Sequence, residues 1–136
     1  MSKKNIWDSL NLDTPPESIK KFLEDEYSNL EEKTNGKLSI EITLDFINNY
    51  DTNIDNIIRF YKFFIVENKS GYRIKFFTLT NANTINEYPL YLDDIYDKER
   101  NNIVITNKDE LKNEIDKTLS SSIVVIKIQE MYHMFD

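Results

Sequence analysis

Few side chains in this sequence could carry acid–base, nucleophilic or metal chemistry. The 136 residues include one His and no Cys, which excludes thiolate nucleophiles, disulfides and Cys-based zinc sites. The single imidazole, His133, stands close to the C-terminal end, where a catalytic side chain is seldom held in a fixed position. The two glycines, Gly36 and Gly71, are too far apart to form a phosphate-binding loop. We therefore expect no catalytic residue and no cofactor.

Carboxylates are plentiful, but their spacing follows no catalytic or metal-binding pattern. The chain has 24 acidic and 17 basic side chains, a net charge of -7 and a pI near 4.8. The densest acidic cluster, residues 93–99, lacks the alternating ligands and the central Gly of a calcium-binding loop. Pairs such as Glu41 and Asp45 arise by chance in so acidic a chain and do not indicate acid–base catalysis. We expect no bound metal.

Basic and aromatic side chains alternate along two segments that we expect to form a hairpin, residues 57–67 and 72–79. Such interleaving is typical of sheets that bind single-stranded nucleic acid, but a net charge of -7 opposes contact with phosphates. We expect the phase that contains Phe60 and Phe64 to face the core. The opposite phase also carries large apolar side chains, so it needs either a covering helix or a partner protein. Its members are Arg59, Tyr61, Phe63, Ile65, Arg73, Lys75, Phe77 and Leu79.

The elements that would position these residues follow from cap, turn and periodicity signals. Thr14, followed by two prolines and Glu17, is typical of a helix start, and we expect that helix to end before Gly36. Apolar and polar residues alternate from 38 to 46, which indicates a strand with one wet face. Pro89 cannot donate to a β-ladder, so we expect its strand to lie at a sheet edge. The expected order is a helix over 14–34, strands over 38–46, 57–67, 72–79, 88–92 and 103–106, a helix over 107–119 and a central strand over 123–128.

This order predicts an α+β fold in one domain. We expect a mostly antiparallel sheet of five or six strands, an N-terminal helix and a second helix before the last strand, with the helices packed on one face. The domain is expected to span residues 13–130, between an N-terminal tail over 1–12 and a C-terminal tail over 131–136. We find no secretory signal and no apolar run long enough to cross a bilayer, so we expect a cytoplasmic protein. The abundance of Ile, Asn and Lys favours a bacterial or phage source with an AT-rich genome.

Two acidic stretches are the best candidates for a functional surface, one on the first helix and one between strands. Opposite charge on two proteins accelerates their association and selects partners, and Tyr is common at the centre of interfaces. We expect partner contacts from Glu24, Asp25 and Glu31 on the helix, and from Tyr91, Asp93, Asp94, Tyr96 and Asp97 between the strands.

The combination of small size, acidity and α+β architecture is similar to that of small immunity proteins that neutralise bacterial toxins. We therefore expect a non-enzymatic acidic binding protein that engages a protein partner, with a basic partner favoured, and that binds neither nucleic acid nor a membrane. The alternative is a self-associating structural protein, such as a homodimer, that uses the apolar hairpin face or the edge strand at 88–92.

Overall fold

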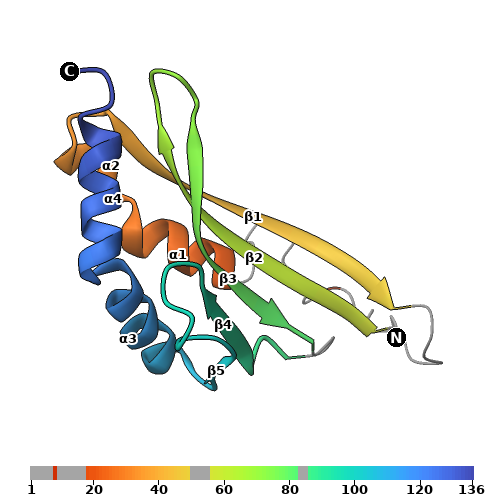
Figure 1. Ribbon diagram of the computed structural model, residues 1–136. Helices are drawn as coiled ribbons and strands as arrows, with labels where there is room; N and C mark the ends of the chain where they lie inside the picture. The colour runs from red at the N-terminus through yellow and green to blue at the C-terminus, as the bar shows by residue number, and fades with distance from the viewer. Residues whose placement is uncertain (1–7, 9–17, 50–55, 83–85) are drawn as a thin grey trace, which may run out of the picture.

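The computed structural model describes residues 8, 18–49, 56–82 and 86–136, which form one antiparallel sheet with helices on one of its faces (Figure 1). The five strands lie in chain order across the sheet. This arrangement confirms the expected α+β fold. The elements are α1 (Ile19–Tyr27), α2 (Asn29–Lys33), β1 (Leu38–Asn49), β2 (Asn56–Glu67), β3 (Arg73–Asn81), β4 (Leu90–Asp94), β5 (Ile103–Ile105), α3 (Lys108–Leu119) and α4 (Ser122–Tyr132).

The first helix begins where a serine side chain can cap it. Oγ of Ser18 accepts a hydrogen bond from the Lys21 amide at 3.1 Å, which satisfies one of the free amides of the first turn. Ile19 and Leu23 then fall on one face of α1 and are buried in the core. The helix start expected at Thr14 lies outside the described residues.

The helical segment ends at a left-handed glycine, as expected. Ser28 separates α1 from α2, and Gly36 follows α2 with a φ of +80°. Between them, the buried Thr34 links the helix end to the first strand, because its Oγ1 accepts a hydrogen bond from the Leu38 amide at 3.0 Å. This bond sets the point at which the chain enters the sheet.

The strand expected after this turn is present, and its alternation decides which side is wet. Leu38 and Ile42 of β1 are buried, whereas Glu41 and Asp45 are exposed on the opposite face. The predicted hairpin between β2 and β3 is also present, with Gly71 in the left-handed region at its turn.

On β2, and on β3 from Phe77 onward, the two faces are the reverse of those expected, whereas Arg73 and Lys75 lie on the open face as expected. Phe63 and Ile65 are each 1% exposed, and the Tyr27 ring of α1 packs edge-on against Phe63 at a centroid distance of 6.1 Å. Phe60 and Phe64 lie on the open face of the sheet and are half-buried. The large apolar side chains in the phase of Phe63 and Ile65 are therefore covered by the helical layer, and they need no partner protein to cover them.

A β-bulge in β3 explains part of this error. Phe63 pairs with Phe77, but the next residue, Phe64, pairs with Lys75, so Phe76 is the extra residue on β3. Phe76 and Phe77 are consequently both fully buried although they are neighbours in sequence. Strict alternation would have placed one of these two rings in solvent.

The segment expected as a central strand at 123–128 is instead the helix α4. Val124 and Met131 are buried and Ile128 is half-buried, and their spacing of four and three residues lies along one helix face. The β-branched residues of this segment favour a strand locally, but burial of this face against the core outweighs that preference. Because α4 continues to Tyr132, the folded part also extends past the boundary expected at 130.

The strand at Pro89 is not a sheet edge, because β5 pairs with the far side of β4. Leu90 pairs with Ile105, and Leu92 pairs with Ile103 on one side and with Leu79 on the other. Pro89 precedes the first paired residue, so its missing N–H does not interrupt the ladder. The edge strands are therefore β1 and β5.

The helix expected at 107–119 is present as α3 and is capped as its sequence indicates. Oδ1 of Asn107 accepts a hydrogen bond from the Glu110 amide at 2.9 Å. The Glu110 carboxylate in turn accepts a hydrogen bond from the Thr106 backbone amide at 2.7 Å, whereas a capping box would use the amide of Asn107. Leu111 and Ile115 are fully buried and hold α3 against the core.

Candidate protein-binding surface

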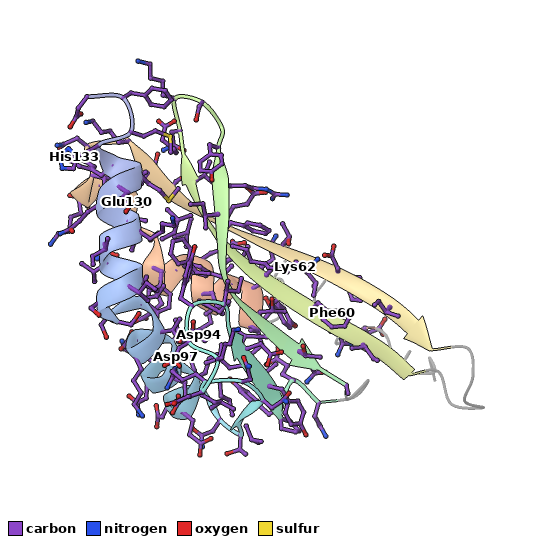
Figure 2. The ribbon with its side chains drawn as sticks, in the orientation of Figure 1. Phe60, Lys62, Asp94, Asp97, Glu130 and His133 are labelled. Atoms are coloured by element: carbon purple, nitrogen blue, oxygen red, sulfur yellow. The ribbon has the colours of Figure 1, made fainter. Side chains whose placement is uncertain are left out.

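The acidic loop that follows β4 is organised by its own carboxylates, of which Figure 2 labels Asp94 and Asp97. Asp94 is only 4% exposed, and its Oδ1 accepts a hydrogen bond from the Tyr96 amide at 2.9 Å. Oδ2 of Asp94 lies 3.5 Å from Nε of Arg100, and Nη2 of Arg100 donates to the Glu114 carboxylate at 2.8 Å. Asp94 and Arg100 therefore tie the loop to α3, and the Asp94 carboxylate itself does not reach the surface.

Of the other four residues expected between the strands, two lie on β4 and two lie in the loop that follows it. Tyr91 and Asp93 alternate with buried residues of β4 and are half-buried on the open face of the sheet. Tyr96 packs on Phe76, with ring centroids 5.5 Å apart, and burial raises its pKa. Asp93 and Asp97 each accept a hydrogen bond from a backbone amide of the same loop, at 2.9 and 3.0 Å. These carboxylates shape the loop as well as charging its surface.

The acidic residues predicted on the first helix are free to meet a partner. Glu24, Asp25 and Glu31 are all exposed. Glu24 forms an ion pair with Lys20 at 3.4 Å, but both side chains are more than 40% exposed, and such pairs contribute little to stability. Since α1 and α2 contact β1, whereas the acidic loop follows β4, the structure does not bring the two predicted clusters together.

A set of apolar side chains is exposed on α4, the blue helix at the left of Figure 1. Ile123, Val125 and Ile126 are 49%, 39% and 53% exposed. A helix that is apolar on all sides is normally buried, so an exposed apolar side calls for an explanation. We refer to these three residues as the α4 strip.

An apolar groove of about 180 Å³ lies beside this helix. Tyr27 of α1 and Leu30 of α2 line one part, Ile128 of α4 lines another, and Phe63 of β2 contributes from the sheet. We call this hollow the α4 groove. Its full lining consists of Tyr27, Asn29, Leu30, Lys33, Ile40, Phe63, Ile65, Leu119 and Ile128.

A polar network fixes the Tyr27 side of this groove to α3. The Tyr27 hydroxyl donates to Asp116 at 2.8 Å, and Lys112 bridges Asp116 at 2.8 Å and Glu26 at 3.1 Å. Burial, followed by the hydrogen bond to Asp116, raises the pKa of Tyr27. Burial also opposes ionisation of Asp116, but hydrogen bonds from Lys112 and Tyr27 outweigh it and hold the Asp116 pKa below its usual value. Tyr27 is therefore a fixed, neutral part of the groove.

A second hollow of about 410 Å³ lies where the end of α4 meets the β2–β3 turn. Lys37 and Lys69 line it, but Lys37 pairs with Asp136 at 3.3 Å and lies 4.4 Å from the Tyr132 ring centroid. The side-chain amide of Asn68 accepts a hydrogen bond from the Ser39 hydroxyl at 2.7 Å and donates one to the Gly36 carbonyl at 2.8 Å. These polar groups are already engaged, so the hollow is a weaker candidate for a ligand site than its volume suggests.

Chemical groups for catalysis do not gather at either hollow. His133 is 61% exposed at the end of α4, and its ring contacts the Asp136 carboxylate. Among the described residues, no three His, Asp or Glu side chains are grouped as a metal site would require. Within the same ranges, no helix is both long and apolar enough to cross a membrane.

Comparisons with protein-family models, with curated proteins and with solved structures find no match for this chain. The interpretation of its surface therefore depends on its own geometry. The α4 strip and the α4 groove were not predicted, because the segment at 123–128 was expected to be a buried strand. The available signal was its periodicity, since Val124, Ile128 and Met131 recur at the four- and three-residue spacing of one helix face.

Proposed function

We propose that this chain is a non-enzymatic binding protein of the inhibitor or immunity type, which docks a basic protein partner at the α4 strip and the α4 groove. The observation that carries the proposal is the exposure of apolar side chains on α4, a helix that also contributes Ile128 to a groove lined mainly by hydrocarbon. Exposed apolar side chains beside a concave apolar site are typical of binding surfaces in soluble proteins.

The groove suits one large apolar anchor from the partner. Its volume of about 180 Å³ is comparable to a single Leu or Phe side chain with its backbone, and not to a drug-sized ligand. Binding energy at interfaces is concentrated in a few such anchors that enter preformed pockets. Lys33 and Asn29 supply polar groups at the same site that could orient the anchor's backbone.

The acidic side chains of α1 and α2 favour a basic partner. Glu24, Asp25 and Glu31 are exposed on the helices that also supply Tyr27 and Leu30 to the groove. With a net charge of -7 on the whole chain, a positively charged partner would be attracted before contact, and salt would weaken that attraction.

The loop after β4 has a separate role in this proposal. Tyr91, Asp93, Tyr96 and Asp97 remain predicted partner contacts, outside the α4 groove. Asp94 instead supports the structure of that loop, because its carboxylate pairs with Arg100 and accepts a hydrogen bond from the Tyr96 amide.

The proposed interaction takes place in the cytoplasm of a bacterium, or of a bacterium infected by the phage that encodes the chain. The absence of Cys from the chain is compatible with a reducing compartment, in which disulfides would not form. A binding protein in this compartment can act on intracellular enzymes or on toxins that enter the cell.

Affinity capture with two matched variants tests the proposal. Ile126 on α4 and Val104 on β5 are both 53% exposed, but Val104 lies on the sheet face opposite the helices. Wild type and Val104→Glu should retain the same basic protein from a lysate of the source organism, and Ile126→Glu should lose it. If both variants retain the protein equally well, α4 is not the docking surface.

The charge contribution is tested with the captured protein once it is purified. Combined Glu24→Gln, Asp25→Asn and Glu31→Gln substitutions should slow association several-fold at low salt, because they remove three charges that attract the partner. The difference from wild type should shrink as salt is added. An association rate that neither the substitutions nor salt alters would remove charge from the proposal.

A further inference from the structure

The outer edge of β1 is long and has few of the features that usually protect sheet edges, Glu41 and Asp45 being its only charged side chains. β1 has 12 residues, against 3 in β5 at the other edge of the sheet. It contains no Lys, Pro or Gly and pairs with β2 without a bulge. In the described part of the chain, no strand pairs with its outer side. An edge of this kind is a template for the addition of another strand.

Even-numbered residues of β1 direct their backbone groups toward this edge. The backbone amide of Leu38 donates to Thr34 Oγ1 at 3.0 Å, on the side away from β2. The backbone carbonyl of Lys37, one residue earlier, instead accepts from the backbone amide of Asn68, on the side of β2. In an antiparallel strand, alternate residues bond to opposite sides, so the residues in phase with Leu38 face outward. Because the Leu38 amide already has its acceptor, the segment available for pairing begins at Ile40 and runs to the end of β1.

The side chains of this segment combine neutralised charge with exposed hydrocarbon. Glu41 pairs with an arginine of β3 at 3.1 Å, and Asp45 pairs with a lysine of β2 at 2.9 Å. Phe46 and Ile47 are 60% and 53% exposed near the end of the strand. An added strand would cover these apolar groups without separating either acid from its own cation.

We propose that a second copy of this chain pairs antiparallel with β1, with the two-fold axis at Leu44, so that two five-stranded sheets form one continuous sheet. Leu44 is the third of the five outward-facing residues in the available segment. In this register, Ile42 of one copy faces Phe46 of the other, and Thr43 faces Asp45. Glu41 of one copy faces Ile47 of the other, so no acid faces another acid in this register.

Neighbouring registers of the two β1 strands are less favourable, because they bring like charges together or use a backbone group that is already bonded. An axis at Thr43 places Glu41 opposite Asp45 of the second copy, and an axis at Asp45 places the two Asp45 carboxylates opposite each other. Like charges directly opposite in a sheet are destabilising. An axis at Ile42 would bring the second copy against Leu38, whose amide is already bound. Self-complementarity of the sequence at one register is the reason to choose an identical chain as the occupant.

This association should respond to salt in the opposite way to the docking of a basic partner. Two copies of a chain with a net charge of -7 repel each other, so added salt should strengthen the dimer. The two interactions can therefore be separated in solution, and failure of one leaves the other standing.

A cysteine introduced at the axis tests the register directly. The chain has no Cys, so Leu44→Cys carries a single thiol. In a hydrogen-bonded antiparallel pair, the two Cα atoms at the axis lie about 5.5 Å apart, within the range of a disulfide. Under mild oxidation, Leu44→Cys should form disulfide-linked dimers faster than Val104→Cys, whose exposed position on β5 gives the rate of random collision. Equal rates would overturn the proposal.

Charge substitutions at Thr43 provide a second test by sedimentation. Thr43 pairs with Lys62 of β2, so Thr43→Glu is compatible with the monomer. Facing Asp45 of the second copy, however, it should raise the dissociation constant of the dimer roughly fivefold to tenfold. Thr43→Lys should lower it for the same reason. A wild-type chain that stays monomeric at all concentrations, or two variants that shift in the same direction, would contradict the register.

Discussion

The ion pairs around Arg100 lead to the prediction whose magnitude follows most directly from the structure. Arg100 lies between two acids, with Nη2 at 2.8 Å from the Glu114 carboxylate and Nε at 3.5 Å from Asp94. The Asp94 side chain is 1% exposed, whereas the Arg100 side chain is 20% exposed. Replacement of Arg100 by Met keeps most of the aliphatic volume but leaves the Asp94 charge buried without its cation.

We expect Arg100→Met to lower the free energy of unfolding by about 3 kcal/mol. Removal of one member of a buried ion pair costs about 3–5 kcal/mol, and the partial exposure of Arg100 places this case at the lower end. In urea, with an m-value near 2 kcal/mol/M, the midpoint should fall by about 1.5 M. Unfolding followed by circular dichroism measures both quantities.

Lys117 provides the matched control because, like Arg100, it pairs with Glu114. Its Nζ lies 3.4 Å from Glu114, but the Lys117 side chain is 64% exposed, so Lys117→Met should cost less than about 1 kcal/mol. Addition of Asp94→Asn to Arg100→Met should recover part of the lost stability by removing the uncompensated charge. If Arg100→Met costs no more than Lys117→Met, the assignment of Asp94 and Arg100 as the support of the loop is wrong.

Three further predictions concern the fold. Thr34→Val should lower the free energy of unfolding by about 1–3 kcal/mol, measured in urea, because the Leu38 amide loses its acceptor. Val124→Lys should cost more than about 3 kcal/mol and Ile126→Lys less than about 0.5 kcal/mol; equal costs would contradict a helix, since both residues share one face of a strand. Glu67→Gln should destabilise at neutral pH, with the gap from wild type closing from about pH 5 to pH 2. Burial raises the pKa of Glu67, but hydrogen bonds from the turn outweigh it, so the stabilisation is lost as pH falls through the lowered pKa; a gap that widens in acid would contradict this.

Local signals predicted the elements of this fold whose structure is decided within a few residues. The alternation from Leu38 to Phe46, the turn at Gly71 and the cap at Asn107 each depend on neighbouring residues and are present. The antiparallel character of the sheet also followed, because short connections favour antiparallel neighbours, but the order of the strands across the sheet was left open. These features required no knowledge of distant contacts.

The errors occurred where contacts distant in sequence decide the outcome. Phe76 and Phe77 are both buried because a bulge in β3 changes the alternation at a position set by pairing with β2. The apolar segment that contains Val124 suits a strand by composition, and only its packing over the sheet makes it a helix. Strand pairing on both sides of β4 likewise could not be inferred from Pro89.

The candidate site was predictable only in part for the same reason. Glu24, Asp25 and Glu31 were expected at the surface from helical periodicity, and they are exposed. The α4 groove is bounded by α1, α2, α3, α4 and the sheet, so its existence depends on how five parts of the chain pack together. Asp94 was expected at the surface because its burial depends on Arg100 and α3.

The most direct test of the central claim is site-specific photo-crosslinking from α4 in a lysate of the source organism. A photoreactive amino acid replaces Ile126 in one sample and Val104 in the other, two positions of equal exposure on different faces. The proposed function predicts that the Ile126 position crosslinks to one basic protein, while the Val104 position does not. Equal crosslinking from both positions, or crosslinks from α4 to many unrelated proteins, would contradict a specific partner at the α4 strip.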